Sequence, residues 1–256
     1  MKNYKSALGN IIVMWIVGLS PVIFPSLYFV FSDGKYLNIG MAIAMLLGGF
    51  LSIYVMKKEY HVNIKNYLRK PDTKTSLLVM ATAVFYVITV MYVVYMPLME
   101  GETEIDALKV VELTFFSIAS PIGEELVFRF SMLTLLLIAA QNSRIKTVFS
   151  IVLVSVLWMM IHFSGNSLRS IDIIIVGMML GFIFLKSKNI IYCIMFHITA
   201  NVITYSVAVF NQWFLEREYI LFISVPMFLL FFVTLSYRLC RSADIEFAFS
   251  ECEAKG

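Results

Sequence analysis

Charged residues are scarce in this chain of 256 residues, and their scarcity excludes most soluble folds. Asp, Glu, Lys and Arg together make up 14% of the sequence, whereas hydrophobic residues make up 60%. A mean hydropathy of +0.85 leaves too little polar surface to keep a domain dissolved in water. We therefore expect an all-α, polytopic membrane protein rather than an unusually apolar soluble domain.

Cysteine is also rare, and the three cysteines form no pattern typical of a disulfide framework. The zinc-protease string HExxH is absent, which excludes an ordinary zincin helix. The net charge of +3 is small, and most of the basic residues lie in loops beside apolar runs. Such residues are typical of topology signals rather than a nucleic-acid surface, so we expect no nucleic-acid partner.

Long apolar runs are what the chain has instead, and they predict about eight transmembrane helices of roughly 20 residues in one bundle. No linker, low-complexity tract or convincing repeat divides the chain, so residues 1–256 are expected to form a single membrane domain with a short polar tail at 241–256. The first run has no cleavage site and predicts an uncleaved span. The eight runs cover residues 8–31, 37–56, 76–96, 113–139, 147–163, 171–186, 189–210 and 219–240.

The distribution of lysine and arginine predicts the orientation of these spans. If the N-terminus is cytoplasmic, most basic residues fall in cytoplasmic segments, as the positive-inside rule requires. We therefore expect a multi-pass protein of the cell membrane with both termini in the cytoplasm and membrane lipid around it. The outer segments then hold only Lys35, Lys109, Arg169 and Arg217.

Two features of the spans bear on helix packing. Gly177 and Gly181 form a G-x-x-x-G pattern that lets a neighbouring helix approach closely. Packing within one subunit is the first interpretation, and a homodimer face is the alternative. Pro121 interrupts the run 113–139, where it can kink the helix and free backbone carbonyls.

Ionisable and amide side chains occur inside three of the predicted spans. An ionisable residue there costs about 2.5–3.5 kcal/mol, so it is expected to face the interior of the bundle and to serve a function. A Glu–Arg pair that only locks two helices, or an Asn that only bonds neighbouring helices, remains the structural alternative. The residues are Glu124, Glu125 and Arg129 in one span, His162 in the next, and His197 with Asn201 in a third.

Helical spacing separates the roles of the two glutamates. Glu125 and Arg129 are four residues apart, so they lie on one helix face and are expected to pair. Glu124 lies about 100° around the helix and is expected to be the carboxylate that remains available for chemistry. Gly123 is expected to leave room beside it for a substrate or water.

Together these groups favour hydrolysis. Glu124 can take a proton from water, His162 can orient that water above the ring of Trp158, and His197 with Asn201 can donate hydrogen bonds to a developing oxyanion. Alternatively, Glu124, His162 and His197 could hold a zinc ion with one position open for water. The sequence leaves the zinc and the metal-free mechanisms both open.

The ordered strings EELVFR, WMMIH and HITAN resemble those of the CAAX protease and bacteriocin-processing family, also called Abi. They run from Glu124 to Arg129, from Trp158 to His162 and from His197 to Asn201, within core spans at 113–210. Trp158 departs from the family pattern, in which phenylalanine is commoner, but it keeps an aromatic ring.

The resemblance implies an intramembrane endopeptidase, a hydrolase or metalloprotease acting on a lipidated protein or a peptide. Members cleave prenylated C-termini, or process bacteriocins and signalling peptides. The family's water-activating pair maps to Glu124 and His162, and its later polar pair maps to His197 and Asn201. A non-catalytic bacteriocin-immunity or regulatory protein is the alternative function, and a proton-coupled transporter is a third.

One conflict remains at the level of the sequence. His162 lies near the outer end of its predicted span, whereas Glu124 lies near the middle of its own. Cleavage of a prenylated protein would need access from the cytoplasm. Either Pro121 breaks its helix and moves Glu124, or the orientation is reversed, or the substrate enters from outside.

Overall fold

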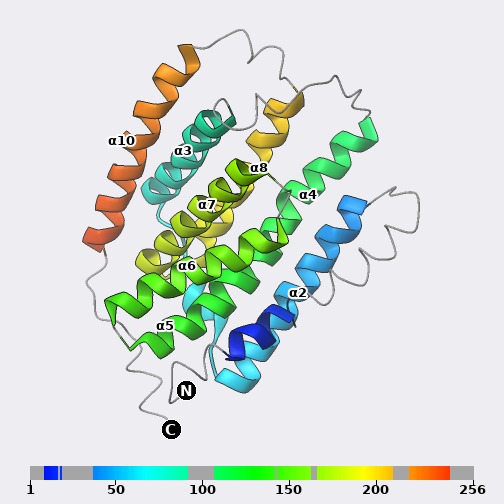
Figure 1. Cartoon of the computed structure of the whole chain (residues 1–256), viewed down its shortest axis with the longest axis vertical. Helices are drawn as coiled ribbons and strands as arrows, with labels where there is room; N and C mark the ends of the chain where they lie inside the picture. Colours follow the sequence, from blue (N-terminus) through cyan, green and yellow to red (C-terminus); the bar gives the residue numbers. More distant parts are fainter. Residues whose placement is uncertain are drawn as a thin grey trace.

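The computed structural model describes residues 9–16, 18, 37–91, 107–141, 143–162, 166–209 and 219–242. All regular elements in these ranges are helices, and they run broadly alongside one another (Figure 1). Residues 9–16 and 18 of the first predicted span are helical, and its remaining residues lie outside the described ranges. The other elements are α2 (Leu37–Tyr60), η1 (Ile64–Tyr67), α3 (Thr73–Val90), α4 (Ala107–Glu125), η4 (Leu126–Leu133), α5 (Thr134–Ala140), α6 (Arg144–Ile161), α7 (Ser167–Ser187), α8 (Ile190–Val209) and α10 (Tyr219–Ser242).

The protein is an all-α polytopic membrane protein, as the apolar runs predict. In the described part of the chain, 5 helices are long and apolar enough to cross a membrane, and Ile190–Tyr205 of α8 is a shorter apolar stretch. The path through α4 and η4 carries the buried Glu124, Glu125 and Arg129. Helix α10 continues through Ser242, so its last residues overlap the start of the predicted polar tail at 241–256.

The fourth run differs most from its prediction of 113–139. Its helix begins at Ala107 and stays helical through Ala140, with Pro121 inside α4. Pro121 therefore does not break the helix. Five residues later the backbone widens into the π-helix η4, where all residues from Leu126 to Leu133 are buried. Short π-helical segments inside α-helices are common at functional sites.

Helix starts follow from the local sequence. Asp72 caps α3 by accepting a hydrogen bond from the Thr75 backbone N–H, and Ser143 and Asn166 cap α6 and α7 in the same way. Such side chains satisfy backbone donors that have no partner within the helix. These caps fix where the helices that carry the site begin.

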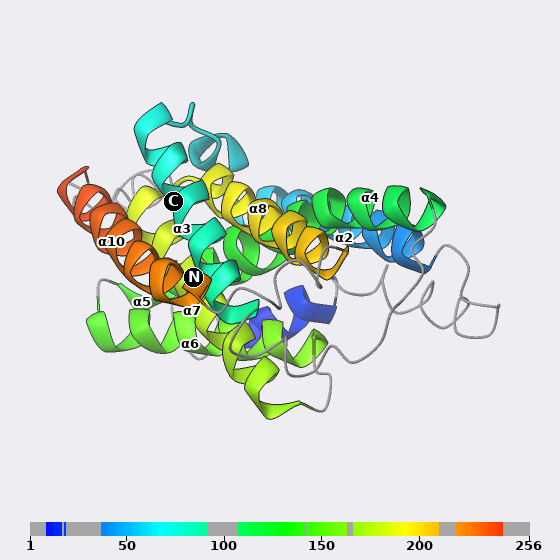
Figure 2. The ribbon, with the colours of Figure 1, turned by 90° about the horizontal axis from the view of Figure 1, so that it is seen from above.

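Pairs of helices pack through small residues and aromatic rings. A Cβ atom on Gly177 would lie 2.8 Å from Ser155 Cβ, and one on Gly181 would lie 2.8 Å from Ile151 Cγ2. The G-x-x-x-G pattern thus packs α7 on α6 within one chain, which is the first of the two interpretations. Helix α7 also contacts α8, and the view from above separates α6 from α8 (Figure 2). The elements that carry the polar residues therefore surround the middle of the bundle.

Candidate active site

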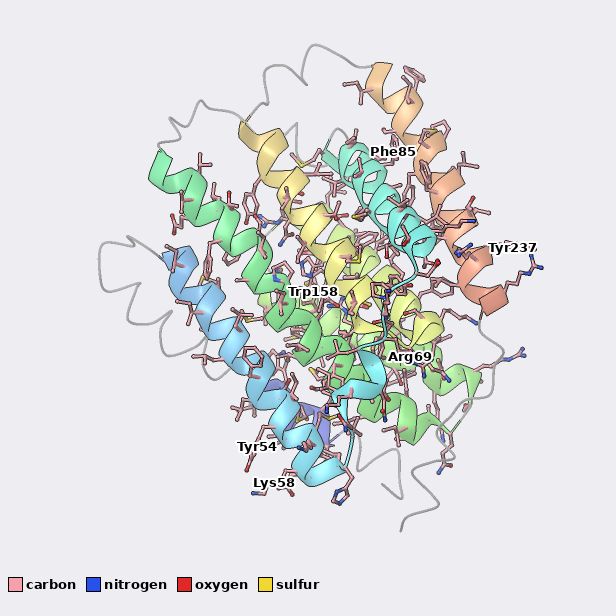
Figure 3. The ribbon with its side chains drawn as sticks, turned by 180° about the vertical axis from the view of Figure 1, so that it is seen from behind. Tyr54, Lys58, Arg69, Phe85, Trp158 and Tyr237 are labelled. Atoms are coloured by element: carbon pink, nitrogen blue, oxygen red, sulfur yellow. The ribbon has the colours of Figure 1, made fainter. Side chains whose placement is uncertain are left out.

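The four side chains predicted to act in catalysis all line one cavity. Its volume is about 330 Å³, and its walls come from α3, α4, α6, α7 and α8 together with Met91 and His162. Figure 3 shows Trp158, another lining residue, in the middle of the bundle between α4 and α8. The structure thus brings together residues from three separated stretches: Glu124, His162, His197 and Asn201.

Both carboxylate oxygens of Glu124 accept a hydrogen bond. The Ser120 hydroxyl donates to Oε1 over 2.5 Å, and the Trp158 indole N–H donates to Oε2 over 2.7 Å. Glu124 is 3% exposed. This donor pattern suits an ionised carboxylate, which can only accept. The carboxylate is therefore held in one orientation at the wall of the cavity.

The second glutamate forms the pair that the spacing predicts. Arg129 donates through a terminal nitrogen to Glu125 Oε1 over 3.0 Å, and both side chains are buried. His197 Nδ1 lies 2.9 Å from the same oxygen. The Arg129 guanidinium also lies over the Trp158 ring, 4.6 Å from its centroid. Glu125 and Arg129 therefore support His197 and Trp158, both of which face the cavity.

Hydrogen bonds assign the tautomers of the two histidines. His162 Nδ1 lies 3.0 Å from the Trp158 backbone carbonyl, which can only accept, so Nδ1 carries the proton. His197 Nδ1 donates to Glu125 for the same reason. Each Nε2 is therefore turned toward Glu124 Oε2, at 3.5 Å for His162 and 4.0 Å for His197. These gaps are longer than good direct hydrogen bonds, and a water that contacts all three atoms would lie beside them in the cavity.

Asn201 lies one helical turn after His197 on α8 and lines the same cavity. It is half-buried. No described residue forms a hydrogen bond with its side chain, so its amide is available to a ligand in the cavity. The i, i+4 spacing from His197 places both groups on one helix face, as the sequence predicts.

The difference in depth that the sequence predicts between Glu124 and His162 is absent from the structure. Glu124 and His162 are neighbours because α6 is shorter than the α4 path and ends beside its middle, whereas α4 extends further (Figure 1). The prediction for Gly123 was wrong. A Cβ atom there would lie 2.2 Å from the Met45 carbonyl oxygen, so this glycine allows α2 to pack on α4 instead of making room for a substrate.

Sequence reasoning missed three residues of the site. Ser120 lies four residues before Glu124, a spacing that could have identified it as a hydrogen-bond donor. Asp172 is an acidic residue inside a predicted span, and it accepts a hydrogen bond from Tyr86 across the cavity wall. Pairing Asp172 with Tyr86 required the fold, because these two residues are far apart in the sequence.

In the described ranges, no group of three or more His, Cys, Asp or Glu side chains is arranged to hold a metal ion. The Nε2 atoms face a carboxylate, which is suitable chemistry for zinc, but the arrangement lacks a ready ligand set. Zinc therefore stays a prediction.

Comparison with known protein families gives a match to the segment that carries the site. Residues 106–203 match the family described as type II CAAX prenyl endopeptidase Rce1-like. This stretch resembles the Rce1-like endopeptidases. It includes Ser120, Glu124, Trp158, His162 and His197, and it ends just after Asn201.

The match to the Rce1-like family confirms the resemblance that the three strings predict. It supports an endopeptidase of the CAAX type in general, within a multi-pass membrane protein. Neither a curated protein nor a solved structure shows significant similarity to the chain.

Proposed function

We propose that the protein is an intramembrane endopeptidase that hydrolyses a peptide bond through water activated by Glu124. The observation that carries this proposal is the meeting of one carboxylate oxygen and two imidazole Nε2 atoms at one point of the cavity wall. A general base must lie within reach of the proton that it removes, directly or through one water. Glu124 Oε2 meets that condition for a water in the cavity.

In the proposed reaction, a water molecule lies in the cavity beside Glu124 Oε2 and His162 Nε2 and donates one hydrogen bond to each. Glu124 takes one proton while the water oxygen bonds to the carbonyl carbon of the scissile peptide. The C–N bond then breaks, and the proton on Glu124 passes to the leaving amine. The products are a carboxylic acid and an amine, so atoms and charge balance.

His197 and Asn201 are the donors that we assign to the oxyanion. Glu125 holds His197 through Nδ1, which leaves Nε2 facing the cavity, and Arg129 offsets the charge of Glu125. When His197 carries a second proton, Nε2–H can donate to the oxygen of the tetrahedral intermediate, and the Asn201 amide can donate beside it. Such fixed donors act strongly where bulk water is excluded.

The substrate is a membrane-associated protein or peptide. The cavity walls include apolar residues such as Val87, Val90 and Ile173, which suit an extended apolar chain. The cavity lies toward the ends of α3 and α8 that are away from most of the basic residues. With cytoplasmic termini, this is the outer half of the membrane, which favours a bacteriocin or signalling peptide over a cytoplasmic prenylated C-terminus.

The test is cleavage of labelled peptides by purified protein in lipid discs. The panel holds a farnesylated peptide, the same peptide without its lipid, and an apolar membrane peptide. We expect the wild type to cleave a peptide of the panel. We expect the cleavage rate of His162→Asn to be at least about 100-fold lower, because general acid–base catalysis contributes about 10²–10⁴-fold. Elemental analysis of the same sample reports whether zinc accompanies the activity.

His61→Asn is the matched control, because His61 is exposed, lies in the basic loop after α2 and does not line the cavity. It should cleave as wild type does. A folded His162→Asn variant that retains full activity would overturn the proposed mechanism. A wild-type protein that cleaves none of the peptides, yet confers the same phenotype as both variants, would support a non-catalytic immunity or regulatory role.

A further inference from the structure

A second cavity lies at the other end of the bundle, away from the proposed active site. Its volume is about 680 Å³, and it lies between the loop before α3, the junction of α7 with α8, and the end of α10. Arg69 and Tyr237, labelled in Figure 3, come from two of these walls. The ionisable acid–base side chains that line it include one acid, Asp72, and five bases: Arg69, Lys70, Lys186, Arg238 and Arg241.

The single acid, Asp72, already accepts hydrogen bonds from Thr75 and Arg238. Asp72 Oδ2 accepts from the Thr75 backbone N–H at 2.8 Å, from the Thr75 hydroxyl at 2.7 Å and from Arg238 at 2.7 Å. These hydrogen bonds, those from Thr75 above all, hold the pKa of Asp72 well below its usual range. Asp72 thus offsets the charge of Arg238 and leaves the other four basic side chains uncompensated.

No other described residue neutralises these four. Within the described ranges, Arg69, Lys70, Lys186 and Arg241 take part in no salt bridge and no side-chain hydrogen bond. The neighbouring Lys188, at the end of α7, shows the same excess of positive charge. Its pKa is lowered first by burial and then by the charge of Arg69. The cavity therefore presents a strongly positive potential.

The floor of the cavity is formed by residues that hydrogen bonds hold in place. Asn189 is 3% exposed and donates through Nδ2 to the Arg69 backbone carbonyl over 2.9 Å. The Tyr192 hydroxyl accepts from the Asp72 backbone N–H over 2.8 Å. These two bonds hold the loop that carries Arg69 against the start of α8. The basic side chains therefore surround a cavity whose floor is held in a defined conformation by hydrogen bonds.

The position of the cavity matches the level of lipid headgroups. It lies where α3 and α8 begin and where α7 and α10 end, at the boundary of the candidate spans. Beside it, Leu77 on α3 and Tyr237 on α10 expose large apolar surfaces. Acyl chains can lie along that surface while a headgroup enters the basic hollow.

We propose that this cavity binds the phosphate group of an anionic lipid headgroup. Basic pockets between transmembrane helices suit such headgroups, and guanidinium groups bind phosphate oxygens in pairs. Arg69 and Arg241 supply that geometry, while Lys70 and Lys186 add positive charge. The same phosphate chemistry is offered by free inorganic phosphate, so the test separates the two sources.

The test measures lipid binding by the full chain in discs of phosphatidylcholine, with and without phosphatidylglycerol, and with inorganic phosphate as a separate arm. The double variant Arg69→Gln, Lys186→Gln keeps the Asn189 bond, because that bond uses the Arg69 backbone. Each basic group near an anionic headgroup contributes about fivefold, so the double variant should bind phosphatidylglycerol about 25-fold more weakly.

The matched control is Lys57→Gln, Lys58→Gln, which removes two positive charges at the end of α2 outside the cavity. It should bind phosphatidylglycerol as wild type does. Equal loss in both double variants would overturn the proposal, because it would show general surface attraction. Equal binding of phosphatidylcholine and phosphatidylglycerol by the wild type would also overturn it. Inorganic phosphate that saturates the cavity and that the lipid cannot displace would overturn it as well.

Discussion

Removing the hydroxyl of Ser120 should slow catalysis without disturbing the cavity itself. This hydroxyl donates to Glu124 Oε1 over 2.5 Å, and Ser120 is 1% exposed, so bulk water cannot replace it. A hydrogen bond to a charged group contributes about 1.5–3 kcal/mol. At about 1.4 kcal/mol for each tenfold change in rate, Ser120→Ala should lower kcat about 10- to 150-fold. Ser120 does not line the cavity, so KM should change little.

The assay is steady-state cleavage of the best peptide of the panel by purified variants in lipid discs. Ser117→Ala is the control, because Ser117 lies one turn earlier on α4, is equally buried, and donates to the backbone carbonyl of Leu113 instead. It should cleave at close to the wild-type rate. If Ser120→Ala and Ser117→Ala show the same kcat, the hydroxyl does not orient the base, and the assigned role of Glu124 loses its support.

Three further predictions concern stability, measured as the thermal unfolding midpoint in detergent. Gly123→Ala should destabilise the fold by about 1–3 kcal/mol or more, because its Cβ would meet the backbone of α2, whereas Gly9→Ala meets nothing and should be neutral. Arg129→Ala should cost about 3–5 kcal/mol by leaving Glu125 buried and unpaired, and a midpoint equal to wild type would contradict that pairing. Asp72 has a pKa lowered from 3.8, so its stabilising effect is present above that value and is lost as pH falls below it. Wild type should therefore lose stability below about pH 4, and Asp72→Asn should be less stable at neutral pH and lack that acid-dependent fall.

The fold class could be predicted from the sequence because hydropathy alone decides whether a segment can cross a bilayer. The bounds of α2, α6, α7 and α10 fall close to the predicted runs. The start of α4 could not be predicted from hydropathy. Its first turn at Ala107 follows an acidic stretch, and average hydropathy cannot separate a polar helix end from a loop.

The site could be predicted in part. The i, i+4 rule identified the pair Glu125 and Arg129, because that contact lies within one helix. The i, i+4 rule cannot predict contacts between different helices. The indole of Trp158 donates to Glu124, and this bond depends on how α6 packs against α4. A phenylalanine at that position could not make it, so the departure from the family pattern supplies a donor that the string itself did not reveal.

Gly123 is a second residue whose neighbour in the fold could not be predicted from the sequence. The sequence predicts that its missing side chain leaves space for a ligand, whereas in the structure the backbone of α2 fills that space. A glycine in a sequence shows only that something approaches closely. Which partner approaches depends on the tertiary arrangement.

The most direct test of the central claim is peptide cleavage by Glu124→Gln, measured beside Glu59→Gln. The first variant keeps the size of the side chain but removes the base, and the second makes the same change at a surface position of α2. With both variants folded, the account predicts a loss of at least about 100-fold for Glu124→Gln and none for Glu59→Gln. Cleavage by folded Glu124→Gln at the wild-type rate would contradict it.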